Sequence, residues 1–186
     1  MIERPVMRGK RINLRLLEEV DLSKRVEYFN DPDINATLNV PVPVSYAETR
    51  AWFSKLLLNN SRRDFSIFLN DTDELIGFCG LTSIDTRHRK AELYMLVGAS
   101  GCSGKGYGRD ANMLLGNFAF IELGLQKLYS YQLISNDRAI RSKEVLGWNR
   151  DGVLRKDVCT HGVFQDRATY SLLREDWVAN DVYKNV

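Results

Sequence analysis

A run of glycines between residues 98 and 108 constrains this chain more than any other feature of its sequence. One or two glycines are enough to make a turn, but this run holds five of the chain's thirteen. An apolar, β-prone segment, Lys90–Val97, precedes the run. From Arg109 onward, apolar residues recur at the three- and four-residue spacing of a helix that buries one face. The sequence therefore predicts a strand, a glycine-rich loop and a helix in direct succession over residues 90–119.

These three parts together are suited to binding an anion. Glycine has no Cβ, so the backbone of the loop can come close to a ligand and turn its N–H groups toward it. The first N–H groups of the following helix lack partners within the helix, and the helix dipole places partial positive charge at the same end. We therefore expect this loop to hold a phosphate group.

The spacing of the glycines excludes two common phosphate-binding loops. A P-loop requires G-x-x-x-x-G-K-[S/T]. Gly101 and Gly106 have the required glycine spacing, but Tyr107 and Gly108 follow where Lys and Ser or Thr are needed. The dinucleotide-binding pattern G-x-G-x-x-G is not completed in either possible register, and this loop lies past the midpoint of the chain rather than in a first βα unit.

Residues 103–108, SGKGYG, resemble the pyrophosphate-binding loop of the GNAT superfamily of N-acetyltransferases, [Q/R]-x-x-G-x-[G/A]. Both glycine positions match, while Ser103 stands where the family has Gln or Arg. Further segments resemble the RimJ/RimL-like branch of this superfamily, in the family's order and spacing: INLRLLEEVDL, ELIGFCGLTSID, RKAELYMLV, GKGYGRDA, FAFIELGLQKLY, NDRAIRSKEVLGW and VFQDRATYSLLREDW. The resemblance covers nearly the whole chain. It implies a single acetyltransferase domain over residues 1–186 that takes acetyl-CoA as its co-substrate.

The expected order of strands and helices agrees with this resemblance. Periodicity and turn residues predict strands near residues 10–16, 64–69, 75–84, 90–97, 127–135, 153–160 and 165–173, and helices near 21–29, 45–58, 109–119 and 136–146. This order is neither a Rossmann alternation nor a segregated α+β pattern. We expect a mixed α/β fold of the GNAT type, with a central twisted mixed sheet of about seven strands flanked by about four helices.

Composition limits the partners and the compartment. A length of 186 residues suffices for one domain with a core of its own. The net charge of +2 gives no reason to expect a nucleic acid or an anionic membrane. No apolar run approaches the roughly 20 residues that span a bilayer, and the first residues do not resemble a signal peptide. Three unclustered cysteines indicate reduced thiols in a cytoplasm and argue against a zinc site, so no metal is expected. The protein is expected to be a monomer or a homodimer.

Glu92, in the predicted central strand, is the candidate general base. The GNAT resemblance implies transfer of acetyl to a primary amine by direct attack in a ternary complex. An alkyl ammonium has a pKa near 10, so a nearby carboxylate that removes its proton helps the reaction. The histone-acetylating branch of the superfamily carries its glutamate in a similar A-E context. The alternative interpretation is a surface glutamate paired with Arg89 or Lys90.

The same resemblance implies which residues hold acetyl-CoA. A backbone N–H near the end of the central strand, at Leu96, Val97 or Gly98, stabilises the negative charge that develops on the thioester oxygen. The pantetheine arm pairs with the edge of this strand. Asn136 caps the following helix and contacts the CoA arm. The pyrophosphate rests on the N–H groups of the loop, with added charge from two basic side chains, so the expected contacts are Ser103, Gly104, Lys105, Gly106, Tyr107, Gly108 and Arg109.

The group that protonates the leaving thiolate is left open by the sequence. Many GNAT enzymes have a tyrosine seven residues after the asparagine, whereas this chain has Lys143, preceded by Ser142. A CoA thiolate, with a pKa near 8.5, leaves with little protonation. Ser142 and Lys143 are therefore candidates for assistance, but the favoured interpretation is a pair on the helix surface.

The acceptor amine is also open. The candidates are a protein N-terminus, the amine of a nucleotide-linked sugar, and a polyamine or other small amine. His88 and His161 fall in predicted turns and are interpreted as solvated, although His88 with Arg87 and Arg89 could line the acceptor entrance. These basic residues slightly favour an acceptor that carries negative charge. The alternative function is a non-catalytic acyl-CoA-binding module that acts as a sensor or partner protein.

Overall fold

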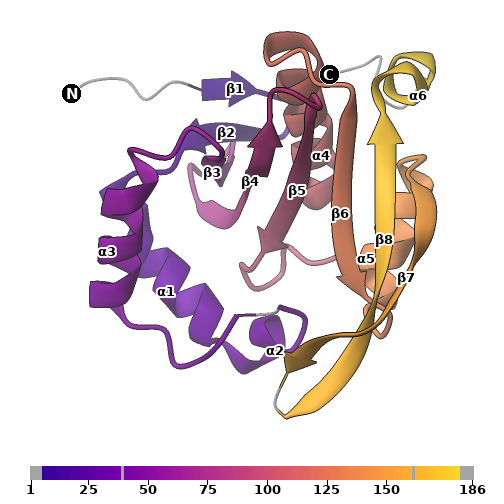
Figure 1. Ribbon diagram of the computed structural model, residues 1–186. Helices are drawn as coiled ribbons and strands as arrows, with labels where there is room; N and C mark the ends of the chain where they lie inside the picture. The colour runs from indigo at the N-terminus through magenta and orange to yellow at the C-terminus, as the bar shows by residue number, and fades with distance from the viewer. Residues whose placement is uncertain (1–5, 39, 161, 181–186) are drawn as a thin grey trace.

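Residues 6–38, 40–160 and 162–180 are described by the computed structural model, and they build one eight-stranded sheet (Figure 1). Its order is β1-β2-β3-β4-β5-β6-β8-β7, and every neighbouring pair is antiparallel except β5 with β6. The strands are β1 (Val6–Arg8), β2 (Ile12–Leu16), β3 (Arg63–Leu69), β4 (Leu75–Asp85), β5 (Lys90–Val97), β6 (Lys127–Leu133), β7 (Asn149–Thr160) and β8 (Val163–Leu173).

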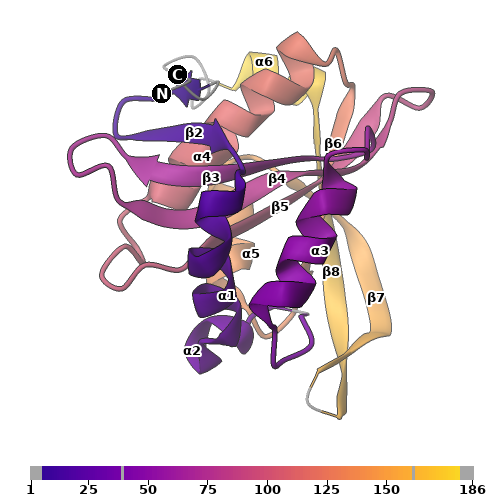
Figure 2. The same ribbon diagram turned by 90° about the vertical axis from the view of Figure 1, so that its left-hand side faces the viewer.

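Helices cover both faces of this sheet. In Figure 2, α1 and α3 lie in front of the strands; α4 and α5 lie behind the sheet in the view of Figure 1. The helices are α1 (Leu22–Asn30), α2 (Pro32–Asn35), α3 (Tyr46–Leu56), α4 (Tyr107–Asn117), α5 (Asp137–Val145) and α6 (Arg174–Ala179). No helix in the described ranges is long and apolar enough to cross a membrane.

The predicted strands and α-helices are all present, and three short ones are added beside a 3₁₀ turn (Glu19–Asp21) and a π turn (Phe118–Glu122). The additions are β1, the single turn α2, and α6, so the sheet has one strand more and the fold two helices more than expected. Helix α2 was missed because residues 31–44 contain three of the four prolines. Pro32 instead occupies the first turn of α2, where its missing N–H costs nothing, and Asp31 caps the turn by accepting from the N–H groups of Asp33 and Ile34.

Local sequence signals set several boundaries as expected. Helix α3 starts with the predicted capping box: the Ser45 hydroxyl accepts from the N–H of Glu48 at 3.1 Å, and the Glu48 carboxylate accepts from the N–H of Ser45 at 3.2 Å. Strand β5 has the predicted bounds. Gly147, which follows α5, has a φ of 75°, as expected for the residue after a helix end.

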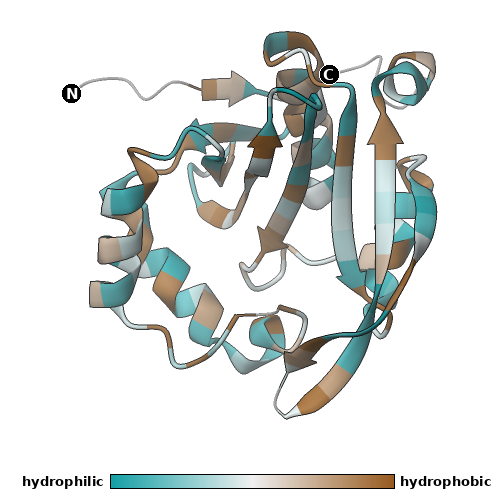
Figure 3. Cartoon of the chain, in the orientation of Figure 1, coloured by the Kyte–Doolittle hydropathy of each residue, from teal (hydrophilic) through white to brown (hydrophobic). Residues whose placement is uncertain are grey.

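The two faces of β5 meet different helices. A Cβ on Gly98 would lie 2.7 Å from the Tyr28 ring of α1, which places the even-numbered positions of β5 on the α1 and α3 side. A Cβ on Gly108 would lie 3.2 Å from the sulfur of Met95, which places the odd-numbered positions on the α4 side. The central strands β4 and β5 are mostly apolar (Figure 3). The predicted alternation along β5 is therefore confirmed, and it puts Glu92 on the face toward α1 and α3.

The sheet opens between β5 and β6. These parallel strands pair only over Lys90–Glu92 and Lys127–Tyr129 and then diverge toward the bottom of Figure 1. Beyond that point β5 stays paired with β4, and β6 stays paired with β8. Residues 93–97 of β5 thus have one edge without a partner strand in the described part of the chain.

Candidate active site

The glycine loop has the backbone shape that only glycine adopts easily. Gly101, Gly104 and Gly106 have φ values of 74°, 76° and 85°, in the left-handed region. Gly106 is the N-cap of α4, which begins at Tyr107. Because glycine has no side chain, no side-chain hydrogen bond caps this helix. The N–H of Arg109 donates to the Gly106 carbonyl at 3.0 Å, so the N–H groups of Tyr107 and Gly108 are the ones available to a ligand at the start of α4, in the segment that the sequence predicts for the pyrophosphate.

Arg11, which immediately precedes β2, braces the loop from the side. Its Nε donates to the Asp110 carboxylate at 2.7 Å, and its Nη1 donates to the Lys105 carbonyl at 2.9 Å. In a trans peptide the carbonyl and the following N–H point in opposite directions. The bond from Arg11 therefore turns the N–H of Gly106 away from Arg11. Sequence analysis missed this residue, which lies 94 positions from Lys105.

A second arginine reaches the loop from α5. The Nη1 group of Arg138 donates to the hydroxyl of Ser103, the residue that departs from the family motif. Asn136 is the N-cap of α5, as predicted, and its Oδ1 accepts from the N–H of Ala139 at 3.0 Å. The start of α5 therefore lies against the loop that precedes α4.

The open edge of β5 offers only some of its backbone groups. The N–H of Gly98 donates to the Ile76 carbonyl at 2.9 Å. Bonding groups alternate along an antiparallel strand, so the N–H of Leu96 also faces β4 while that of Val97 faces the gap toward β6. Of the three N–H groups expected to stabilise the thioester oxygen, only that of Val97 faces the gap and is available to a ligand there.

Glu92 lies half-buried beside the gap. Its carboxylate accepts from the Thr82 hydroxyl at 3.5 Å, and Tyr129 is its neighbour across the β5–β6 pair. Burial raises the pKa of Glu92, although the positive charges of Arg167 and Arg62 and the bond from Thr82 oppose this rise. Arg89 instead donates to the Gly124 carbonyl at 3.0 Å through Nε. The alternative of an exposed pair between Glu92 and Arg89 is therefore wrong.

A buried polar network adjoins Glu92 on the same face. Asp64, which is 4% exposed, accepts two hydrogen bonds from Arg62 at 2.7 and 2.8 Å and one from the Tyr94 hydroxyl. Burial, followed by the Asp64 charge, raises the pKa of Tyr94 far above its usual range. Both oxygens of the Asp64 carboxylate thus already accept hydrogen bonds, from the Arg62 guanidinium and the Tyr94 hydroxyl.

Other arginines in this region are also engaged. Arg167 pairs with Asp157 and lies 4.4 Å from the centre of the Tyr131 ring. Arg25 of α1 is buried among the rings of Phe29, Trp52 and Phe78, with 4.4 to 5.4 Å between its guanidinium carbon and their centres. Sequence analysis identified none of these side chains.

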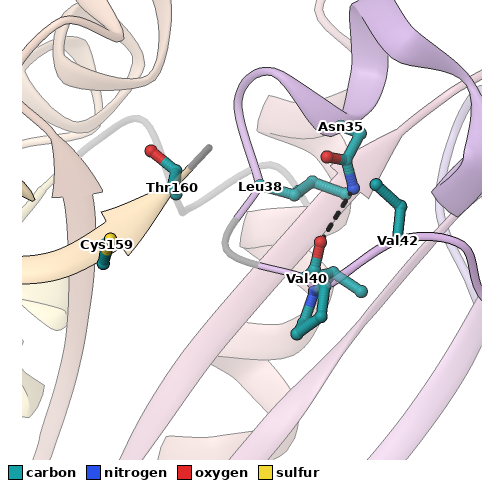
Figure 4. Close-up of a pocket in the computed structure, with 7 residues that line it drawn as sticks. Asn35, Leu38, Val40, Val42, Cys159 and Thr160 are labelled. Atoms are coloured by element: carbon teal, nitrogen blue, oxygen red, sulfur yellow. Dashed lines mark hydrogen bonds between the residues drawn. The ribbon is translucent and has the colours of Figure 1, made fainter. Parts of the chain in front are cut away.

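A pocket of about 290 Å³ lies between the helix layer and the β7–β8 hairpin (Figure 4). Its walls are mostly apolar. Asn35 of α2 holds the wall in shape by donating to the Val40 carbonyl at 3.0 Å. The other lining residues are Leu38, Pro41, Val42, Cys159 and Thr160.

The helix residues considered for the leaving group have different surroundings. Ser142 is exposed, as expected. The interpretation of Lys143 as a surface residue is wrong, because its side chain is buried and its Nζ lies over the Trp148 ring. Burial lowers the pKa of Lys143 to about 7. The signal was present in the sequence, since Ile140, Lys143 and Leu146 recur at three-residue spacing on the apolar face of α5.

His88 is a turn residue, as predicted. It is exposed, and its ring lies 2.8 Å from the Asp85 carboxylate. His161 lies outside the described residues. Within the described ranges, no group of three His, Cys, Asp or Glu side chains is placed to hold a metal ion.

Comparisons with known proteins agree with this geometry. The Acetyltransferase (GNAT) domain family matches residues 11–149. The chain is 27% identical over 171 residues to the uncharacterized N-acetyltransferase p20 of Bacillus licheniformis, covering 90% of this chain and 96% of that protein. It is 26% identical over 170 residues to the spermidine N(1)-acetyltransferase of Vibrio cholerae, covering 91% and 97%.

The solved structures include a match to the Vibrio cholerae spermidine N-acetyltransferase in complex with CoA and spermine. The TM-score is 0.86 at 25% identity, over 91% of this chain and 99% of that one. The predicted GNAT fold and acetyl-CoA as the co-substrate are thereby confirmed. The chain belongs to the GNAT family and is an acetyl-CoA-dependent N-acetyltransferase.

Proposed function

We propose that this protein, working as one domain, moves acetyl from acetyl-CoA to a primary amine by direct attack in a ternary complex, with Glu92 as the general base. The observation that carries this proposal is the position of Glu92. Its carboxylate is half-buried on the strand whose open edge and following loop suit acetyl-CoA. In this proposal the general base and acetyl-CoA both lie along β5 and the loop that follows it.

Acetyl-CoA lies along β5 and its loop in this proposal. The pyrophosphate occupies the segment Ser103–Arg109, the pantetheine arm pairs with the free edge of residues 93–97, and Asn136 contacts the arm. The thioester oxygen accepts from the N–H of Val97. The exposed side chains of Lys105 and Arg109 add positive charge beside the uncapped helix start.

Glu92 accepts the proton of the acceptor ammonium, directly or through a water molecule. The free amine then attacks the thioester carbonyl and a C–N bond forms. The attacking nitrogen loses its second proton to solvent, and the C–S bond breaks to release the CoA thiolate. Burial raises the pKa of Glu92, and a higher pKa makes a carboxylate a better match for an amine proton. The thiolate takes its proton from solvent, because Ser142 is exposed and Lys143 is packed against Trp148.

The acceptor is a primary amine other than a polyamine. Polyamines are cations at several positions and need several free carboxylates. Around Glu92, Asp64 is bonded to Arg62 and Tyr94, and Asp157 is paired with Arg167. These pairings favour a protein N-terminus or a nucleotide-linked amino sugar as the acceptor.

A panel of amines tests this function. Release of the free CoA thiol is followed with spermidine, peptides with different N-termini and nucleotide-linked amino sugars, each with and without the protein. We expect turnover with a peptide or sugar amine and little with spermidine. Efficient turnover of spermidine would contradict the acceptor assignment, and slow turnover of every amine would contradict catalysis by Glu92.

A further inference from the structure

We propose that Arg138, on the first turn of α5, is a ligand of the CoA pyrophosphate. It supplies from a helix the cation that the loop itself lacks at Ser103. This inference rests on the proposed placement of acetyl-CoA at Ser103–Arg109.

The contact between Arg138 and Ser103 places a guanidinium at the loop. Ser103 is 35 residues away in sequence, and its hydroxyl accepts from Nη1 of Arg138. The guanidinium carries five N–H donors, so this bond leaves others for an anion. The Ser103 hydroxyl, acting as acceptor toward Arg138, keeps its own hydrogen free to donate. The two side chains therefore present donors together at one end of the cradle.

The charge on Arg138 is not used within the described part of the protein. Its side chain is exposed, and no carboxylate in the described ranges is paired with it. Arg11, in contrast, pairs with Asp110, and Arg167 pairs with Asp157. A guanidinium bonded only to a neutral hydroxyl, beside uncapped helix N–H groups, has the donor geometry for two phosphate oxygens.

The backbone that carries Arg138 is held in place. Asn136 caps α5 through the N–H of Ala139, one residue beyond Arg138. The start of α5 therefore cannot fray without losing this bond. Arg138 reaches the loop from a fixed turn rather than from a mobile segment, which limits the backbone ordering that binding of a phosphate requires.

The inference is tested by calorimetric titration of the acceptor-free protein with CoA and with dephospho-CoA, which lacks the 3′-phosphate. We expect Arg138→Ala to lower the affinity for both ligands about tenfold, or about 1.4 kcal/mol. Arg138→Lys keeps the charge but not the fork and should weaken them less. Arg141→Ala, one turn further along α5, is the matched control for loss of one exposed positive charge, and it should leave both affinities within about twofold.

Moving the guanidinium onto the loop separates ligand binding from a structural role. Ser103→Arg in the Arg138→Ala background places a guanidinium at the same end of the cradle and should restore most of the lost affinity. No rescue, together with an equal loss in Arg141→Ala, would overturn the proposal. A loss seen with CoA but not with dephospho-CoA would also overturn it, by assigning Arg138 to the 3′-phosphate. If the unaltered protein bound neither ligand, the placement of acetyl-CoA itself would fail.

Discussion

The ammonium nitrogen of Lys143 lies 3.5 Å from the centre of the Trp148 ring, inside the packing of α5. An indole face attracts a cation, but burial removes the ammonium from water. Burial lowers the pKa of Lys143 from 10.5 to about 7. The folded protein therefore favours the neutral amine, whereas the unfolded chain keeps the charged form up to about pH 10.

The first prediction concerns the stability that this lysine costs. The pKa of Lys143 is lower in the folded protein than in the unfolded chain. The free energy of unfolding is therefore highest above pH 10.5, and it decreases as the pH falls toward 7. Relative to Lys143→Met, the unaltered protein should gain up to about 1.4 kcal/mol of unfolding free energy per pH unit between pH 7.5 and 9.5. Urea unfolding at three pH values measures this. A pH-independent difference between the two proteins would show that Lys143 is not buried as an amine.

The second prediction concerns the leaving thiolate. We expect Lys143→Met and Ser142→Ala each to keep kcat within about tenfold, because the CoA thiol has a pKa near 8.5 and the thiolate leaves unaided. Lys143→Met is preferred to alanine, since it retains the volume that packs on Trp148. Steady-state release of free thiol measures both variants. A fall of about a hundredfold in a folded variant would assign general-acid catalysis to the altered residue.

The third prediction concerns Glu92. Glu92→Gln keeps the size of the side chain but cannot take a proton, so kcat at pH 7 should fall by about 10²–10⁴ while the affinity for acetyl-CoA stays unchanged. Raising the pH should recover part of the loss, because more acceptor arrives as the free amine.

The unaltered enzyme should also show an acid limb above the ordinary glutamate pKa, since burial raises the pKa of Glu92. The matched control is Glu122→Gln, which changes an exposed glutamate. A Glu92→Gln enzyme with near-normal kcat at pH 7 would remove Glu92 from the mechanism.

The fourth prediction concerns the loop backbone. Gly106→Ala forces a Cβ into a left-handed conformation with a φ of 85°. It should weaken CoA binding at least tenfold, or about 1.4 kcal/mol, because the N–H groups at the start of α4 lose their alignment. Gly162→Ala imposes similar strain at a φ of 77° in the β7–β8 turn, where a Cβ would meet no atom within 4 Å. Equal CoA affinities for the two variants would place the pyrophosphate elsewhere.

The fifth prediction concerns Arg11. Arg11→Ala leaves the Asp110 carboxylate unpaired in the first turn of α4, close to the proposed phosphate site, and releases the Lys105 carbonyl. CoA affinity should fall several-fold, and Asp110→Asn in the same background should restore part of it by removing the negative charge. The loss of CoA affinity that remains in the double variant measures how much the Arg11 bond to the Lys105 carbonyl contributes by orienting the loop. An unchanged affinity in Arg11→Ala would show that the loop holds its shape alone.

The sequence predicts the parts of this fold that depend on short-range signals. The capping box at Ser45, the bounds of β5 and the N-cap at Asn136 are all decided within a few residues, and all three are confirmed. Short elements were missed because they depend on tertiary packing: β1 has three residues and, within the described part of the chain, pairs with β2 alone.

The candidate site is less accessible from sequence, because its side chains meet across long separations. Arg11 and Arg138 reach the loop from 94 and 35 residues away, and Asp64 bonds Tyr94 from 30 residues away. Ser103 is the position at which the loop departs from the family motif, and we propose that Arg138 supplies the charge there. The burial of Lys143 is not predicted from its residue type, because a lysine is rarely buried, although Ile140 and Leu146 on the same face of the helix pack on the core.

The divergence of β5 and β6 has a mechanical consequence. In the described part of the chain, three residue pairs join the half of the sheet that contains β1–β5 to the half that contains β6, β8 and β7. In the placement of acetyl-CoA that we propose, the pantetheine arm would pair with β5 in this gap and would bridge the two halves. The cohesion of the sheet would then depend in part on the bound co-substrate, and each catalytic cycle would remove and replace that contribution.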